Sequence, residues 1–87
     1  MNTELNVAIN VPKALGKSVK TSINKSSSIL EVIKNNVEKS IVDKIIHDNE
    51  FNRFALIYLN GERIKNADCL IRASQNDIDI IIPMAGG

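Results

Sequence analysis

The sequence predicts an α+β fold in which a mixed sheet of about five strands packs on one main helix. Short segments of alternating apolar and polar residues lie toward both ends of the chain, and a stretch with helical spacing of apolar residues separates them. Fourteen isoleucines, six valines and six leucines supply a branched-aliphatic core that suits a β-rich fold. The 87 residues are enough for one small domain but leave little room for a deep catalytic pocket. We therefore expect a protein that is not itself an enzyme.

The first segments predict a β-hairpin. Apolar and polar residues alternate over residues 4–11, which indicates a strand with one buried face. Pro12 ends this strand, because proline has no N–H to donate to a sheet. A second alternating strand covers residues 19–24, and the short connection makes the two strands a hairpin.

The middle of the chain predicts helical structure. Ser28 and Glu31 have the spacing of a capping box, in which each side chain bonds the backbone N–H of the other residue, so a helix begins here. Apolar residues then recur three or four positions apart. The pattern fits either one helix over residues 28–47 or two helices joined near Ser40. Asp48-Asn49 is the expected end of the helical region.

The second half of the chain predicts three more strands. Residues 54–59 form an apolar and aromatic run, and Asn60-Gly61 is a strong tight-turn signal because both positions tolerate positive φ. A short return strand follows over residues 62–65. After an irregular stretch, residues 78–82 form the last strand, which Pro83 ends.

Composition excludes several classes of function. The net charge is +1 and aromatic residues make up 3% of the chain, so neither a basic patch nor a base-stacking surface for nucleic acid is expected. The chain begins with neither a basic nor an apolar leader segment and has no apolar run long enough to span a bilayer. We expect a cytoplasmic protein that binds neither nucleic acid nor a membrane.

The last five residues, Pro83-Met84-Ala85-Gly86-Gly87, carry the most specific signal. Together with the element order and the stretches 56–62 and 76–87, this tail resembles that of the ubiquitin-like β-grasp sulfur carriers. That family includes the small subunit of molybdopterin synthase and its thiamine-pathway counterpart. The resemblance covers the whole chain in element order. Ile82 departs from it, because the molybdopterin branch usually has a proline there, whereas the length and the segment 41–52 are closer to that branch.

The resemblance implies a β-grasp domain over residues 1–82 and a flexible reactive tail over residues 83–87. It implies that an ATP-dependent adenylating enzyme of the E1-like class activates the carboxylate of Gly87, which is then converted to a thiocarboxylate. A larger synthase subunit, or another sulfur acceptor, would receive the sulfur. Five extended residues reach about 17 Å, and Gly86 has no Cβ, so the tail could enter a narrow channel of a partner.

The same resemblance and the strand pattern give the candidate docking residues. Tyr58 and Ile81 are expected on the sheet face that is open to a partner, and Pro83, Met84 and Ala85 lead to the reactive end. We expect no cofactor bound by this chain, because ATP and Mg²⁺ would belong to the activating partner. The single Cys69 and the single His47 make no metal site.

Two other functions fit the same sequence. A ubiquitin-like modifier would use the same adenylate to join Gly87 to a lysine of a target protein. A plain interaction domain would have the same fold and an inert tail.

Overall fold

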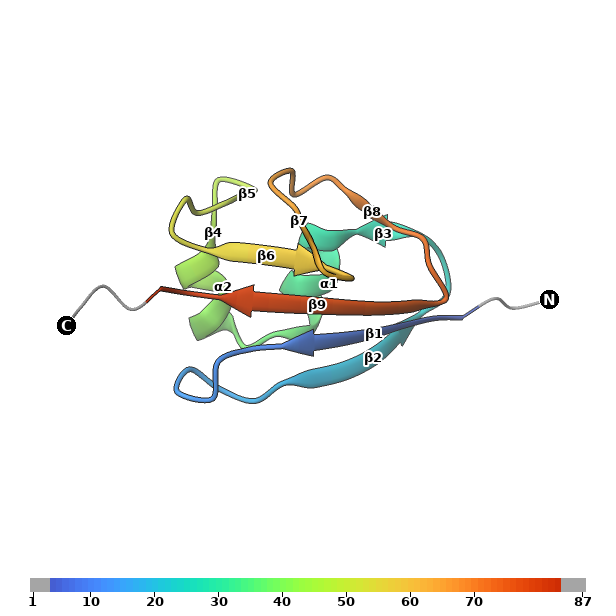
Figure 1. The fold of residues 1–87 in the computed structure, drawn as a ribbon, viewed down its shortest axis with the longest axis horizontal. Helices are drawn as coiled ribbons and strands as arrows, with labels where there is room; N and C mark the ends of the chain where they lie inside the picture. The colour runs from blue at the N-terminus through green and yellow to red at the C-terminus, as the bar shows by residue number, and fades with distance from the viewer. Residues whose placement is uncertain (1–3, 84–87) are drawn as a thin grey trace.

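A mixed five-stranded sheet forms the centre of the molecule, which is described over residues 4–83 by a computed structural model (Figure 1). The elements are, in chain order, β1 (Leu5–Asn10), β2 (Val19–Ile23), β3 (Ser27–Ser28), α1 (Ile29–Asn36), α2 (Lys39–Ile45), β4 (Ile46–His47), β5 (Glu50–Phe51), β6 (Leu56–Leu59), β7 (Glu62–Arg63), β8 (Leu70–Ile71) and β9 (Gln75–Ile81). The strand order in the main sheet is β2-β1-β9-β6-β7. The central pair β1 and β9 is parallel, and the other neighbours are antiparallel. This arrangement is the predicted β-grasp fold.

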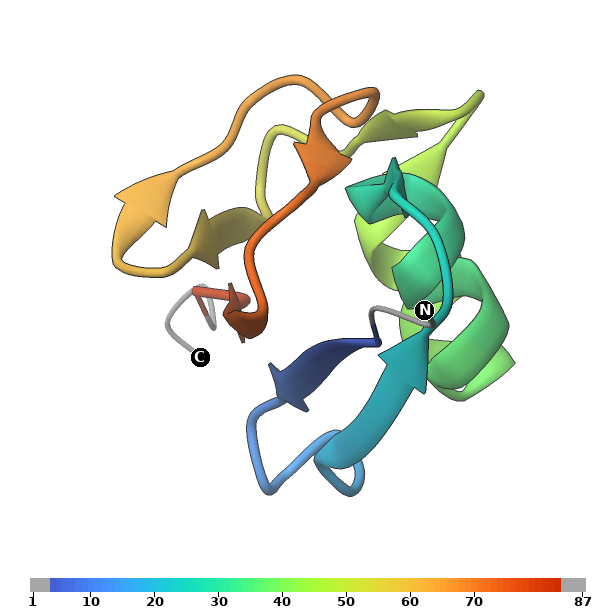
Figure 2. The ribbon, with the colours of Figure 1, turned by 90° about the vertical axis from the view of Figure 1, so that its right-hand side faces the viewer.

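Successive side chains of each strand point to opposite faces of the sheet, and the apolar ones determine which face packs into the core. In β1, Leu5, Val7 and Ile9 are buried, as the alternation predicts, and in β9 Ile78 and Ile80 are buried. Both helices cover this side of the sheet (Figure 2). No helix of residues 4–83 lies on the opposite face, so the side chains that alternate with the core residues remain available for contact.

The helical region consists of two short helices. The Oγ of Ser28 accepts a hydrogen bond from the backbone N–H of Glu31 at 3.2 Å, which confirms the predicted start. Val37 interrupts the helix with an extended backbone (φ −101°, ψ 147°), three residues before Ser40. Of the two alternatives, the structure therefore has the two-helix form. Neither helix is long and apolar enough to cross a membrane in residues 4–83.

Asp48 and Asn49 do not end a helix, contrary to the prediction. The second helix ends at Ile45, and Asp48 and Asn49 form the turn between β4 and β5 with φ of 53° and 62°. Short polar side chains tolerate this left-handed region, so the same pair of residues that favours a helix end also suits a tight hairpin. His47 consequently lies in β4, where it is exposed.

The turn at Asn60-Gly61 is confirmed, with φ of 52° and 85°. Asn60 also fixes the adjacent strand β9, because its Oδ1 accepts from the N–H of Asp77 and its N–H donates to the Asp77 carbonyl, both at 2.8 Å. β9 starts at Gln75, three residues before the predicted start at Ile78, because Gln75 pairs with Asn6 of β1. Residues 75–77 are all polar, so the spacing of apolar residues does not indicate that this part of the chain is a strand.

We expect Ser28→Ala to lower the free energy of unfolding by about 1 kcal/mol, because α1 loses the side-chain hydrogen bond at its N-cap. Denaturant unfolding followed by circular dichroism measures the change. Ser40→Ala is the matched control: this exposed serine lies inside α2, where alanine is a better helix former. A loss in the control equal to that in Ser28→Ala would show that the cap contributes nothing.

Candidate docking face and exit of the tail

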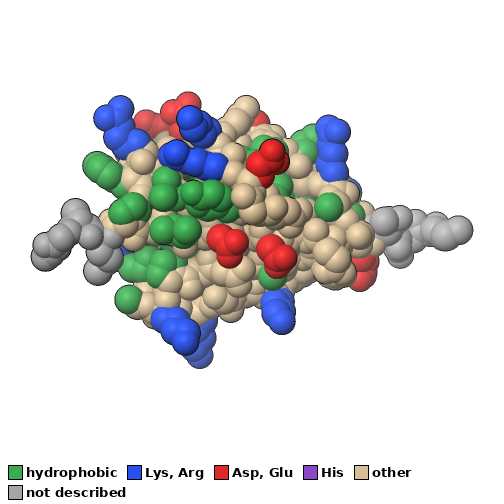
Figure 3. Space-filling view, in the orientation of Figure 1, with side chains coloured by type: hydrophobic (Ala, Val, Ile, Leu, Met, Phe, Trp, Pro, Cys, Tyr) green, Lys and Arg blue, Asp and Glu red, His purple; other side chains and the backbone are tan. Residues whose placement is uncertain are grey.

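The uncovered face of the sheet presents an apolar surface near the end of β9. Leu56 of β6 lies directly opposite Ile81 of β9, and Tyr58 lies opposite Asp79. All four side chains point away from the helices, because the residues that alternate with them, Ile57 and Ile80, are buried. Figure 3 shows hydrophobic side chains gathered on this face.

An open groove of about 620 Å³ lies on this surface. Its apolar lining includes Val11, Pro12, Tyr58, Ile81 and Ile82, which come from three separate segments of the chain. Exposed apolar surface with a polar border is typical of a protein-binding site. The groove adjoins the point where the chain leaves the sheet toward the Gly-Gly tail.

Three consecutive isoleucines illustrate how the strand divides its side chains between the core and this surface. Ile80 is 2% exposed, Ile81 is 45% exposed, and Ile82 packs partly against the core. The structure thus has Ile81 on the open face. Ile82 lies beyond the last ladder pair of β9, and it lines the groove as well as touching the core.

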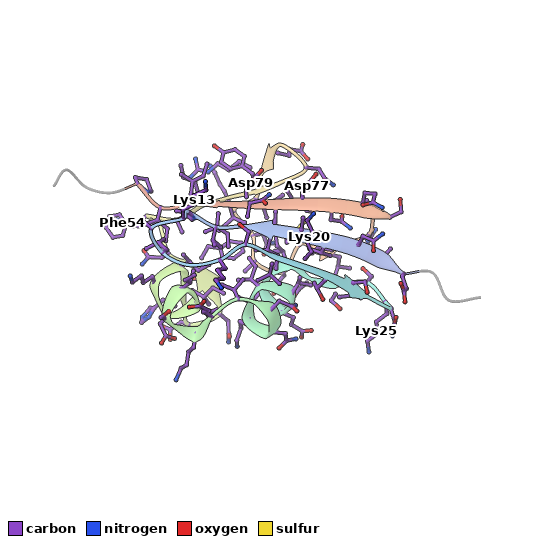
Figure 4. The ribbon with its side chains drawn as sticks, turned by 90° about the horizontal axis from the view of Figure 1, so that it is seen from below. Lys13, Lys20, Lys25, Phe54, Asp77 and Asp79 are labelled. Carbon is purple, nitrogen blue, oxygen red and sulfur yellow. The ribbon has the colours of Figure 1, made fainter. Side chains whose placement is uncertain are left out.

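Phe54 extends the apolar surface at the same end of the sheet. Its side chain is 69% exposed and projects from the end at which β9 finishes (Figure 4). A hydrogen-bonded turn holds it there: the N–H of Phe54 donates to Asn52 Oδ1 at 3.3 Å, and the N–H of Ala55 donates to the Asn52 carbonyl at 2.9 Å. The sequence pattern predicts a strand over residues 54–59 that includes Phe54, whereas β6 begins at Leu56.

The structure brings together some of the residues selected from the sequence. Tyr58 and Ile81 line one groove, and Pro83 is exposed directly after it. Met84, Ala85, Gly86 and Gly87 lie outside the described residues. The docking role of all these residues, and the boundary between domain and tail at residue 83, stay predictions.

The sequence pattern does not indicate that Pro12, Leu56 and Phe54 belong to this face. It predicts Pro12 only as the end of a strand, yet Pro12 lines the groove because β1 ends beside β9. Leu56 belongs to the same face as Tyr58 by alternation, which was the available signal. The exposure of Phe54 depends on the turn at Asn52, and no periodicity indicates such a turn.

The histidine and the cysteine lie in unrelated places. His47 Nε2 lies 3.4 Å from Asp48 Oδ2 in the exposed hairpin, whereas Cys69 is half-buried before β8 and donates its backbone N–H to the Asn66 carbonyl. Across residues 4–83, no three side chains of His, Cys, Asp or Glu gather in a position to hold a metal ion.

Comparison with solved structures shows the same fold in three proteins. The HVO 2177 protein of Haloferax volcanii has a TM-score of 0.73 at 12% identity, over 98% of this chain and 89% of its own. A chain of the BexX/CysO complex of Amycolatopsis orientalis has a TM-score of 0.70 at 21% identity, over 93% of this chain and 99% of its own. SAMP1 of Haloferax volcanii has a TM-score of 0.70 at 12% identity, over 94% of this chain and 99% of its own. At these identities the likeness concerns the fold alone.

No protein-family model and no curated protein sequence matches the chain.

Two neighbouring isoleucines test the division between core and surface. We expect Ile80→Ala to lower the free energy of unfolding by about 2–5 kcal/mol, because it leaves a cavity in the core. Ile81→Ala removes the same atoms from the open face, and we expect a loss of about 0.5 kcal/mol or less. Chemical denaturation of the two variants measures both values, and similar losses would contradict the assignment of Ile81 to the open face.

Proposed function

We propose that this chain is a sulfur carrier that acts through the carboxylate of Gly87. One observation carries the proposal: β9, a central strand of a β-grasp sheet, ends beside an exposed apolar groove, and the sequence continues from it as Pro-Met-Ala-Gly-Gly. The domain supplies a rigid surface for docking, and the five residues after Ile82 supply the reach to a partner's active site. Pro83, directly after the last strand, has a fixed φ and so stiffens the chain where the tail begins.

The proposed chemistry has two steps, and both occur in the active site of a partner. A carboxylate oxygen of Gly87 attacks the α-phosphorus of ATP, and pyrophosphate leaves. A hydrosulfide nucleophile then attacks the acyl carbon and AMP leaves, so the C-terminal carboxylate has become a thiocarboxylate. The E1-like partner would provide Mg²⁺ and the groups that transfer protons, and this chain would provide the reacting carboxylate and the docking surface.

Molybdopterin synthesis is the proposed destination of the sulfur. The chain is longer than the thiamine-type carriers that it resembles, and the additional segment 41–52 forms most of α2 and the β4–β5 hairpin. The acceptor in this proposal is a larger synthase subunit. The presence of the same fold in a two-protein complex, BexX with CysO, supports the idea that a domain of this shape docks on another protein.

Intact-mass spectrometry tests the proposal. We expect the protein, incubated with the adenylating enzyme of its source organism, ATP, Mg²⁺ and sulfide, to gain the mass difference between one sulfur and one oxygen atom. Deletion of Gly87 should abolish this gain, because the adenylated residue is missing, whereas Lys34→Ala on the helical side should leave it intact. An unchanged mass under conditions that modify a known carrier would contradict the proposal.

The same experiment in cell extract separates the two other functions. Covalent adducts on target lysines that disappear when Gly87 is deleted would assign the modifier function instead. The remaining outcome is that deletion of Gly86 and Gly87 changes neither the mass after incubation, nor the covalent adducts, nor the set of bound partners. In that case the tail is inert and the chain is an interaction domain.

A further inference from the structure

A row of side chains with unlike charges crosses the open face of the sheet. This face, which carries Leu56, Tyr58, Asp79 and Ile81, is the candidate docking face. Arg63 of β7 lies opposite Tyr58 of β6, Tyr58 lies opposite Asp79 of β9, and Asp79 lies opposite Asn10 of β1. The open face therefore has a cation on one side of the tyrosine and a carboxylate on the other. Adjacent strands are about 4.8 Å apart, so the Cα atoms of Arg63 and Asp79 lie about 10 Å apart, and no ion pair joins their side chains in the described part of the chain.

The positive side of this row is reinforced by two neighbouring segments. Arg53, Arg63 and Lys65 are all exposed and line one hollow of about 220 Å³. Lysine and arginine side chains border the hydrophobic cluster along the upper edge of the face in Figure 3. These three residues come from the β5–β6 turn, from β7 and from the segment that follows it, and only the fold brings them together.

The carboxylates of this face, Asp77 and Asp79, lie on β9. Lys20 of β2 lies on the same face beyond them, because it is the next residue in the row of Asp77 across β1. In the side view of Figure 4 both carboxylates lie on the side of the sheet away from the helices. Asp79 Oδ1 accepts a hydrogen bond from Asn10 Nδ2 at 2.9 Å, which holds the carboxylate in place on the open face. Within residues 4–83 no lysine or arginine lies within ion-pair distance of a carboxylate, so the charges of the docking face have no internal salt bridge.

We infer that the docking face binds a partner surface in which an apolar side chain is flanked by carboxylates, with the carboxylates over Arg53, Arg63 and Lys65. The inference rests on the proposed function and assigns this acidic and apolar surface to the adenylating enzyme. Charge complementarity of this kind speeds association and fixes orientation. The reversed orientation would bring the partner's carboxylates against Asp77 and Asp79, and like charges disfavour it.

Orientation matters here because the tail leaves the domain at a single point. A carrier docked the other way round would present the same apolar patch, but the tail would point away from the active site. The face is also unbalanced, with the four cations Arg53, Arg63, Lys65 and Lys20 against the two carboxylates Asp77 and Asp79. Two copies packed on each other would leave cations without partners, so a surface with an excess of carboxylates is the better complement.

Direct binding of the purified adenylating enzyme without ATP tests the inference. We expect Arg63→Glu/Lys65→Glu to raise Kd about tenfold or more, because two attractions become repulsions. Lys34→Glu/Lys39→Glu is the matched control, since it changes the net charge equally at exposed positions of α1 and α2. We expect its Kd to stay within about twofold of the original protein. Added salt should weaken binding of the original protein more than that of the Arg63/Lys65 variant.

Three outcomes would overturn the inference: no binding by the original protein, equal Kd changes in the two double variants, or a self-associated dimer that Arg63→Glu abolishes. The last outcome would assign the face to a second copy, and sedimentation velocity detects it. Circular dichroism of both variants checks that the fold is retained. A failure of the proposed function has a different signature, namely binding with the expected charge dependence but no mass gain with ATP and sulfide.

Discussion

The parallel pairing of β1 with β9 is the constraint on which the rest of the structure depends. It joins segments from the two ends of the chain in the middle of the sheet, with Val7 opposite Asn76 and Ile9 opposite Ile78. Buried Asn76 strengthens the junction, because its Nδ2 donates to the carbonyls of Asn6 and Ala73 at 3.1 and 2.7 Å. Such a long-range contact costs chain entropy, which the packing of the intervening hairpin and helices must offset, so the core and the sheet order are mutually dependent.

The same strand also couples the core to the docking face. Because side chains alternate along β9, a shift of one residue in its register would move Ile78 and Ile80 out of the core and bring Asp77 and Asp79 into it. Burial of unpaired carboxylates is costly, so the register that builds the core also determines which residues a partner meets. The docking face is therefore as well specified as the interior, although it is exposed.

Much of the fold could be predicted because local signals agree with it: alternation in β1 and β2, the serine cap of α1, and the turn at Asn60-Gly61. The break at Val37 was not predictable, since an apolar residue continues the helical spacing whether or not the backbone is helical. The face itself could be predicted only in part. Alternation indicates Tyr58 and Ile81, whereas the hollow between Arg53, Arg63 and Lys65 is assembled from segments whose proximity depends on tertiary structure.

The parallel direction of β1 and β9 has a practical consequence for handling the protein. Leu5 lies at the end of the sheet where β9 begins, and Ile81 lies at the other end, about 20 Å away for strands of this length. A fluorophore or an affinity tag placed ahead of β1 would thus be separated from the groove by the length of the sheet. A label on that side could report on complex formation without occupying the space into which the partner must fit.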